Sequence, residues 1–293
     1  MTDKKKYATA ASLRAALEER LKRNSREQGV DLQRLRRQVA FDRFLARVFA
    51  RGAENWALKG GYAMELRLQE ARTTKDIDLT VVHARLLQPL EGEIASRIRR
   101  EIQSYCTEDL QDYFVFLIGE PMMDIDAAPY GGARYPIDVR LDGRTFVKFH
   151  LDVGVGDAVQ DPLETIPGHD WLGFAQIPPP AILMISKEQQ FAEKLHAYTL
   201  PNRPTPNSRV KDLVDMVLLI DRSGMDNSRL LQCMRGTFSR RKTHDIPIRL
   251  SLPDANWEKP FAALATECGL SMDLSLAFNR LNGFFEEFSR LPQ

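Results

Sequence analysis

Two carboxylates separated by one residue are the feature of this chain best suited to chemistry. They are Asp76 and Asp78, within the segment Arg72-Thr73-Thr74-Lys75-Asp76-Ile77-Asp78-Leu79. On a β-strand, alternate residues point to the same face, so both carboxylates would project together while Ile77 and Leu79 turn into a core. Like charges held side by side need a positive partner, and a divalent metal that carries a triphosphate is such a partner. The segment therefore indicates a site that transfers or polymerises nucleotides.

Two further features could complete this site. The pair Gly60-Gly61 lies one short helix ahead of the acids, and free N–H groups at a glycine turn can hold phosphate oxygens. Asp152 lies near the end of a later strand-like run, and an adjacent strand would bring it beside Asp76 and Asp78. Three acids would bind one or two Mg²⁺ ions, and Asp152 could also activate an attacking hydroxyl. The alternative for Asp152 is a strand-end residue that only makes a turn.

A second group of charged residues lies in the C-terminal half. Lys194, in an amphipathic helical stretch, could reach a phosphate as a point charge. Asp212 and Asp215 are three residues apart at the start of another helix, so they share a face. An ordinary explanation exists for each, since Asp212 could contact the helix start and Lys194 could form an exposed ion pair. Their order after an acid-bearing strand favours a functional role.

The elements that position these residues follow from hydrophobic spacing and turn signals. Ser12 and Asp31 are candidate N-caps of two N-terminal helices, and Asp142-Gly143 is typical of a β-hairpin turn. The strand-like runs are 76–82, 114–118, 135–141 and 146–153, and the helical stretches are 12–23, 31–49, 62–69, 87–106, 187–199, 209–221, 228–238, 261–268 and 274–288. Three consecutive prolines at 178–180 can continue neither helix nor sheet, so they mark a boundary.

Bulk composition suits an ordinary globular enzyme, with 293 residues, 43% hydrophobic and 28% charged. The net charge of +1 hides two basic clusters, which either bind phosphate backbones or are solvated helix faces. The clusters are Arg20, Lys22, Arg23, Arg26, Arg34, Arg36, Arg37, Arg43, Arg47 and Arg51, and Arg235, Arg240, Arg241 and Lys242. Cys106, Cys233 and Cys268 form neither a disulfide framework nor a zinc ligand set, so we expect buried, reduced thiols. With no membrane-length apolar run and no signal peptide, we expect a cytoplasmic protein without membrane contact.

Four motifs in order resemble the AbiEii-type nucleotidyltransferase toxins, especially the mycobacterial MenT branch. They are Lys59-Gly60-Gly61, Arg72 to Leu79, Glu193-Lys194-Leu195-His196-Ala197 and Lys211-Asp212-Leu213-Val214-Asp215. The resemblance covers about residues 32–221 and weakens in the last seventy or so. It implies an α+β fold: a polymerase β-like nucleotidyltransferase domain, with a mixed sheet and flanking helices, plus a helical C-terminal domain that closes over the cleft. We accordingly expect a helical arm at 1–52 packed on the core, the nucleotidyltransferase domain at 53–177 and the helical domain at 178–293.

The resemblance also implies a role for each motif residue. Asp76, Asp78 and Asp152 would be the metal ligands and, with Lys194 and Asp215, the catalytic set. Nucleotide binding would fall to Lys59, Gly60, Gly61, Arg72, Thr74, Lys194 and Asp212. Thr74 departs from the family, which often has Ser there, but it keeps the hydroxyl. As a hypothesis, phosphorylation of Thr73 or Thr74 would put negative charge against the acids and repel nucleotide.

The activity that the resemblance implies is Mg²⁺-dependent transfer of a nucleoside monophosphate, from a pyrimidine NTP, to the 3′ acceptor end of tRNA. Such transfer would block aminoacylation and translation, and an AbiEi-like antitoxin would neutralise the enzyme. Three alternatives remain open: transfer to a protein or small-molecule hydroxyl, a non-catalytic module that binds nucleic acid or antitoxin, and a metal-dependent phosphatase. The phosphatase is disfavoured because no His-rich ligand set accompanies the acids.

Overall fold

A computed structural model describes residues 6–68, 70–82, 94–124, 129–201 and 209–289. The chain divides into two compact units, and we describe each by itself. Unit 1 comprises residues 1–66, 73–156 and 164–184, and unit 2 comprises residues 67–72, 157–163 and 185–293. Unit 1 therefore holds both N-terminal helices and extends to Met184, past the three prolines.

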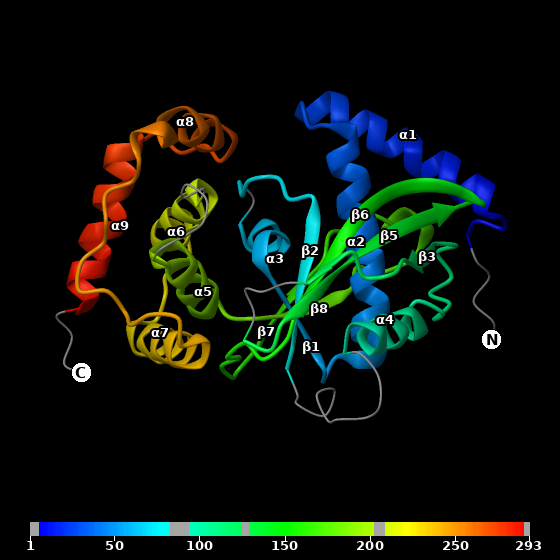
Figure 1. The fold of residues 1–293 in the computed structure, drawn as a ribbon. Helices are drawn as coiled ribbons and strands as arrows, with labels where there is room; N and C mark the ends of the chain where they lie inside the picture. Colours follow the sequence, from blue (N-terminus) through cyan, green and yellow to red (C-terminus); the bar gives the residue numbers. More distant parts are fainter. Residues whose placement is uncertain (1–5, 69, 83–93, 125–128, 202–208, 290–293) are drawn as a thin grey trace. The chain divides into compact units, whose positions relative to one another are not determined.

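Unit 1 is built on a mixed sheet with the strand order β3-β5-β6-β2-β1-β8-β7, and β4 pairs with β5 (Figure 1). The strands are β1 Trp56–Lys59, β2 Asp76–Val81, β3 Val115–Ile118, β4 Met123–Asp124, β5 Gly132–Leu141, β6 Arg144–Gly154, β7 Glu164–Pro167 and β8 Ala181–Met184. Two pairs are parallel, β2 with β6 and β1 with β8, and the others are antiparallel. The expected α+β class with a mixed sheet is confirmed, although hydrophobic spacing did not predict β7 or β8.

One face of the sheet is covered by helices and packed with aromatic rings. The helices of this unit are α1 Ala10–Gln28, α2 Leu32–Gly52, α3, which begins at Gly60 and ends at Arg67, and α4 Ile94–Tyr105. Phe41 and Phe44 of α2 lie 4.9 and 5.8 Å, ring centre to ring centre, from Phe149 of β6. The Asp31 side chain caps α2 by accepting from the Arg34 N–H at 2.9 Å, as predicted. For α1 the expected cap was wrong, because Thr9, not Ser12, accepts the helix N–H. Part of the helix expected at 87–106 lies outside the described residues.

The opposite face of the sheet is polar where β5 and β6 form their hairpin. Asp142 and Gly143 make the turn with φ of 56° and 68°, which fits the predicted hairpin signal. Along β5, buried and partly exposed residues alternate, and along β6 they do so from Phe149 onward. One set of alternating side chains therefore packs into the core, from β6 against α2 and from β5 against α1 and α4, and the other set is available to carry a site.

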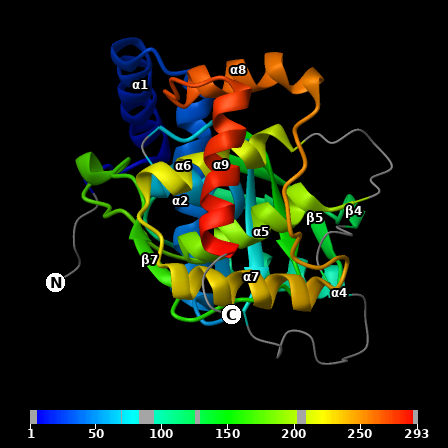
Figure 2. The ribbon, with the colours of Figure 1, turned by 90° about the vertical axis from the view of Figure 1, so that its left-hand side faces the viewer.

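Unit 2 is helical (Figure 2). Its helices are α5 Lys187–Thr199, α6 Val210–Arg222, α7 Asn227–Arg241, α8 Glu258–Glu267 and α9 Leu274–Ser289. They agree with the predicted stretches to within three residues at each end. Leu213 and Val217 of α6 and Leu195 of α5 are fully buried, as their helical spacing requires.

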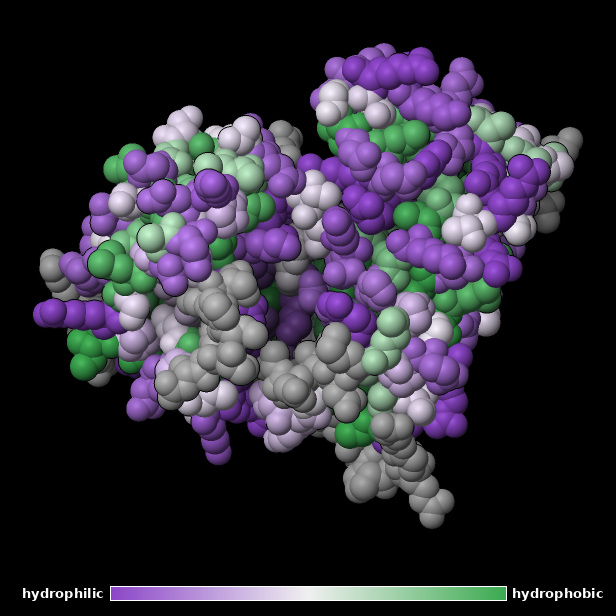
Figure 3. Space-filling model, turned by 45° about the horizontal axis from the view of Figure 1, so that its top comes forward, coloured by the Kyte–Doolittle hydropathy of each residue, from purple (hydrophilic) through white to green (hydrophobic). Residues whose placement is uncertain are grey.

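Surface and thiol features agree with the composition. Hydrophilic residues cover most of the face seen in Figure 3, and hydrophobic residues there form small separate areas. All three cysteines are free and buried. None of the described helices combines the length and the apolar character that a bilayer crossing needs.

Candidate active site

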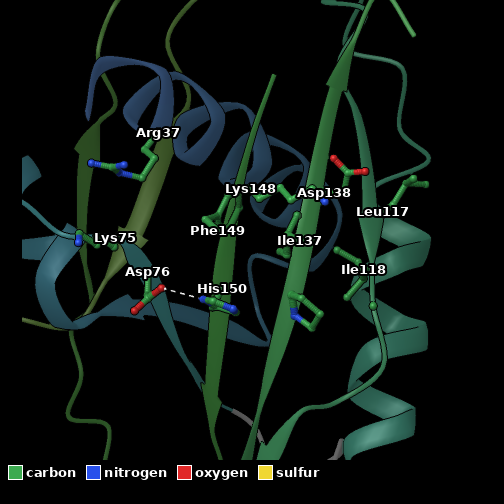
Figure 4. A pocket seen from close by; sticks show the side chains of 12 residues that line it. Arg37, Lys75, Asp76, Leu117, Ile118, Ile137, Asp138, Lys148, Phe149 and His150 are labelled. Atoms are coloured by element: carbon green, nitrogen blue, oxygen red, sulfur yellow. Dashed lines mark hydrogen bonds and ion pairs between the residues drawn. The ribbon is translucent and has the colours of Figure 1, made fainter. Parts of the chain in front are cut away.

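The acids that the sequence singled out lie on two neighbouring parallel strands. Asp78 of β2 is directly opposite Asp152 of β6, and Asp76 is opposite His150. Ile77, between the acids, is fully buried, so Asp76 and Asp78 share the other face of β2. The expectation that an adjacent strand would bring Asp152 beside the acid pair is confirmed. His150 Nδ1 lies 3.3 Å from Asp76 Oδ1, the contact drawn as a dashed line in Figure 4.

A glycine is required at position 60 because a carboxylate lies against its backbone. Gly60 has a φ of 67°, in the left-handed region that side chains disfavour. A Cβ on Gly60 would lie 2.0 Å from Asp78 Oδ2, far inside van der Waals contact. Lys59, the residue before it, pairs with Asp78 in the β1–β2 ladder. The glycine turn thus begins α3 directly beside the acids.

Arg134 of β5 is a member of this site that the sequence motifs did not reveal. Its Nε and Nη2 atoms donate to both oxygens of Asp152 at 2.7 Å each, and its Nη2 lies 3.8 Å from Asp76 Oδ2. These hydrogen bonds to Asp152, and the nearby charges of Asp76 and Asp78, raise the pKa of the guanidinium. The signal that could have found Arg134 is the hairpin register, which places it opposite Asp152. We name Asp76, Asp78, Asp152 and Arg134 the acid cluster. Three carboxylates against one guanidinium leave it two negative charges.

The acid cluster fits a divalent cation in its chemistry. Carboxylate oxygens are the ligands that Mg²⁺ prefers, and a divalent ion would balance the two excess negative charges. Among the described residues, however, no three acidic, histidine or cysteine side chains stand in a ready metal-binding arrangement. Arg134 donates to both oxygens of Asp152, so the guanidinium would compete with a metal for this carboxylate.

Glu65 of α3, which the sequence reading also missed, fixes the chain just ahead of β2. Its Oε1 accepts from the Thr74 N–H at 2.5 Å, and its Oε2 accepts from Gln38 at 2.8 Å. Burial raises the pKa of Glu65 even though Arg34 lies nearby. The Thr74 hydroxyl in turn donates to the Asp76 carbonyl oxygen at 3.3 Å. Thr74 therefore contacts the acid cluster through the backbone of Asp76.

The other predicted residues come together within unit 2. Lys194 Nζ lies 2.6 Å from Asp215 Oδ2 and 3.6 Å from Asp212 Oδ1. Arg72 donates to both oxygens of Asp215, at 3.2 and 2.9 Å, and Arg209 Nη1 lies 3.5 Å from Asp212. We name these five residues the buried ion cluster. Three cations against two carboxylates leave it one positive charge.

Burial and pairing act in opposite directions on the buried ion cluster. Asp215 is fully buried, and Lys194 and Arg72 are only 8% and 9% exposed. Burial alone would raise the pKa of Asp215, but Lys194 and Arg72 outweigh it and hold the pKa below its usual value. Likewise burial would lower the pKa of Lys194, but Asp215 and Asp212 outweigh it and raise the pKa. Lys194 and Asp215 are therefore both charged near neutral pH.

The N-terminal basic cluster is largely paired with carboxylates. Arg43 and Arg47 are buried and lie 2.7 and 2.6 Å from Asp112. Further pairs are Arg36 with Glu18, Arg51 with Glu108 and Arg34 with Glu65. In the second basic cluster, Arg241 is paired with Asp157 at 2.8 Å. For these residues the structure supports ion pairing within the protein rather than a surface for phosphates.

A mixed sheet that carries acids on adjacent strands beside a glycine turn is an arrangement typical of nucleotidyltransferases. The profile of the family "Nucleotidyl transferase AbiEii toxin, Type IV TA system" matches residues 43–281. The chain therefore belongs to the AbiEii toxin family and is a nucleotidyltransferase, as the motifs suggested. Membership in a toxin–antitoxin family implies an antitoxin partner.

One solved structure supports the fold. MenT4, a nucleotidyltransferase toxin from Mycobacterium tuberculosis H37Rv, is similar with a TM-score of 0.62 at 14% identity, over 94% of this chain and 90% of that chain. A putative nucleotidyltransferase from H. pylori aligns with a TM-score of 0.47 at 13% identity, over 90% of this chain and 100% of that chain. None of the curated proteins compared with the chain matches it.

Proposed function

We propose that this protein transfers a nucleoside monophosphate from an NTP to the 3′ end of tRNA, with Mg²⁺ as cofactor and pyrophosphate as the second product. The observation that carries the proposal is the register of β2 and β6, which puts Asp76, Asp78 and Asp152 side by side with excess negative charge. The choice of tRNA and of a pyrimidine nucleotide rests on the resemblance to MenT toxins.

In this mechanism Asp76, Asp78 and Asp152 would hold the metal, which supplies positive charge to the phosphate oxygens. The acceptor hydroxyl attacks the α-phosphorus, its proton passes to Asp152, and the bond to the leaving pyrophosphate breaks. The N–H groups of Gly60 and Gly61 would hold phosphate oxygens, with the Lys59 side chain nearby. Arg134 would leave Asp152 when the metal binds.

The buried ion cluster would serve the triphosphate through its excess positive charge. Lys194 would contribute its ammonium group, and Asp215 and Arg72 would hold that group in one position. Asp212 would form a second, longer ion pair with Lys194 beside that of Asp215. The proposed partners are an NTP, a tRNA and an AbiEi-like antitoxin. Three free thiols support a reducing compartment such as the cytoplasm.

The test is to incubate the protein with total RNA, Mg²⁺ and each labelled NTP in turn. We expect labelled tRNA with the wild-type protein and no incorporation with Asp76→Ala. Asp142→Asn is the matched control, because it removes a carboxylate at the hairpin turn and asparagine tolerates a positive φ. Circular dichroism would show that both variants are folded.

Each other outcome has a definite meaning. Incorporation by Asp76→Ala at the wild-type rate would refute the site. Label on protein or on a small molecule, and not on RNA, would establish another acceptor. A wild-type protein that binds neither Mg²⁺ nor NTP would be a non-catalytic module.

A further inference from the structure

We propose that the exposed sheet face beside Asp76 binds the single-stranded 3′ end of a nucleic-acid acceptor. This surface, the open-sheet groove, has a volume of about 710 Å³ and lies entirely within unit 1. Its lining includes Arg37, Lys75, Leu117, Pro136, Lys148 and His150, with Asp76 at one edge (Figure 4). The inference rests on the proposed function, since it says where the acceptor of that reaction binds.

The strand order places the groove on the correct side of the acids. Across the sheet the order is β3-β5-β6-β2-β1, with the acids on β6 and β2 and the glycine turn at the end of β1. The groove extends from Asp76 over β6 and β5 to Leu117 of β3, away from Gly60. In-line phosphoryl transfer needs the attacking and leaving oxygens on opposite sides of the phosphorus. Phosphates of the NTP on the glycine turn and an acceptor in the groove satisfy this requirement.

Charge in the groove favours a polyanion. Arg37, Lys75 and Lys148 have no carboxylate partner within the part of the chain that the structure describes, whereas Arg43 and Arg47 are paired. The Arg37 Nε atom is buried and has no hydrogen-bond partner among these residues. Asp138, the other acid of the groove, is already held by Arg140 at 3.1 Å. Three unneutralised cations around one groove favour a ligand with several negative charges, such as a phosphate backbone.

The surface between these cations can receive bases. Leu117 is 40% exposed, the His150 side chain is 41% exposed, and Pro136 is half-buried between them on β5. In Figure 4, Lys148 and His150 lie along one strand, with Leu117 on the far side of β5. Flat apolar and ring surfaces let unpaired bases pack without readout of their edges. The groove therefore fits a single strand and provides little sequence discrimination.

Binding of a short single-stranded RNA, labelled at its 5′ end, tests the groove without metal or nucleotide. Lys148→Glu should weaken the affinity about tenfold and reduce the slope of log K against log salt by about 0.7. Arg100→Glu is the matched control, since this exposed arginine lies on α4 outside the groove. It should leave the affinity within about twofold of wild type. A 2-aminopurine at the 3′ end should change its fluorescence on binding, and one at the 5′ end should not.

A transfer assay separates this inference from the proposed function. Lys148→Glu should raise the KM for the RNA acceptor about tenfold and leave the KM for the NTP unchanged. If Lys148→Glu has the RNA affinity and the KM of wild type, the groove does not bind the acceptor, and the proposed transfer reaction is unaffected. If RNA binding depends on Lys148 but no nucleotide is incorporated, the RNA-binding role of the groove is supported and the proposed transfer reaction is refuted. If an acidic peptide displaces the RNA at lower concentration than a second RNA does, the occupant is a protein and the inference is wrong.

Discussion

The acid cluster and the buried ion cluster use the same side-chain types in opposite ways. In the acid cluster, Asp76 remains 33% exposed and Asp152 17%, and carboxylates outnumber the guanidinium. In the buried ion cluster, Asp215 is fully buried and has a cation on each of its oxygens. The carboxylates of the first group are open enough for a ligand to reach them. The second holds its own members in place, and removal of Asp215 takes away a carboxylate that both Lys194 and Arg72 contact.

A third group shows that burial and pairing alone do not indicate function. Asp112 in unit 1 has the same environment as Asp215, because Arg43 and Arg47 occupy its oxygens and its side chain is fully buried. Burial would raise the pKa of Asp112, but both arginines outweigh it and lower the pKa. The family motif distinguishes the two groups, since Lys194 and Asp215 belong to it and Asp112 does not. Net charge does not distinguish them, since two arginines against one carboxylate also leave the Asp112 group one positive charge.

The largest expected effect is the loss of stability in Asp215→Ala. Removal of this carboxylate takes away the nearest acid of buried Lys194 and the acid that Arg72 binds with two hydrogen bonds, which costs about 3–5 kcal/mol of unfolding free energy. Asp76→Ala should change stability by less than about 1 kcal/mol, because its partners are partly solvated. Urea denaturation measures both. Asp112→Ala should behave like Asp215→Ala, and equal effects of Asp76→Ala and Asp215→Ala would break the comparison.

A smaller loss of stability is expected on acidification. Since the folded pKa of Asp215 is below its unfolded value of about 3.9, its contribution to stability is complete above that pH. The contribution is lost as the pH falls through the folded pKa. Stability measured from pH 7 to pH 2 should therefore fall below about pH 4, and more steeply in wild type than in Asp215→Asn. If the stability of wild type and of Asp215→Asn falls in parallel with pH, the pKa of Asp215 is not lowered in the folded protein.

Arg134→Gln tests whether the acid cluster can accept a metal. The guanidinium competes with a metal for Asp152, and a hydrogen bond to a charged group is worth about 1.5–3 kcal/mol. We therefore expect Mn²⁺, measured by titration calorimetry without nucleotide, to bind about tenfold more tightly in Arg134→Gln. Arg140→Gln, six residues further along β5, is the control. Weaker metal binding in Arg134→Gln would mean that Arg134 orients Asp152 for the metal instead of occupying its place.

The sequence predicted the acid cluster better than it predicted the contacts around it. Alternation on β2 and the Asp142-Gly143 turn were local signals, and both were confirmed. Arg134 and Glu65 were missed because their contacts depend on strand register and helix packing, which join residues distant in sequence. The strand β8 was missed because its four residues follow three prolines and are all apolar, so the sequence has no alternation of polar and apolar residues there. The groove, too, depends on four strands that meet only in the folded sheet.

The smallest effect should come from Thr74, which joins the acid cluster only through the backbone. Its hydroxyl donates to the Asp76 carbonyl oxygen, a bond worth about 1 kcal/mol when part-buried. Thr74→Val should reduce stability and nucleotide transfer to this extent, about fivefold in rate, because the start of β2 becomes less fixed. Thr74→Ser keeps the hydroxyl and should match wild type in both measurements. If Thr74→Val has wild-type transfer but Thr74→Glu has none, charge at this position acts on the acids, which supports the phosphorylation hypothesis. If both transfer normally, neither the hydroxyl nor its modification controls the site.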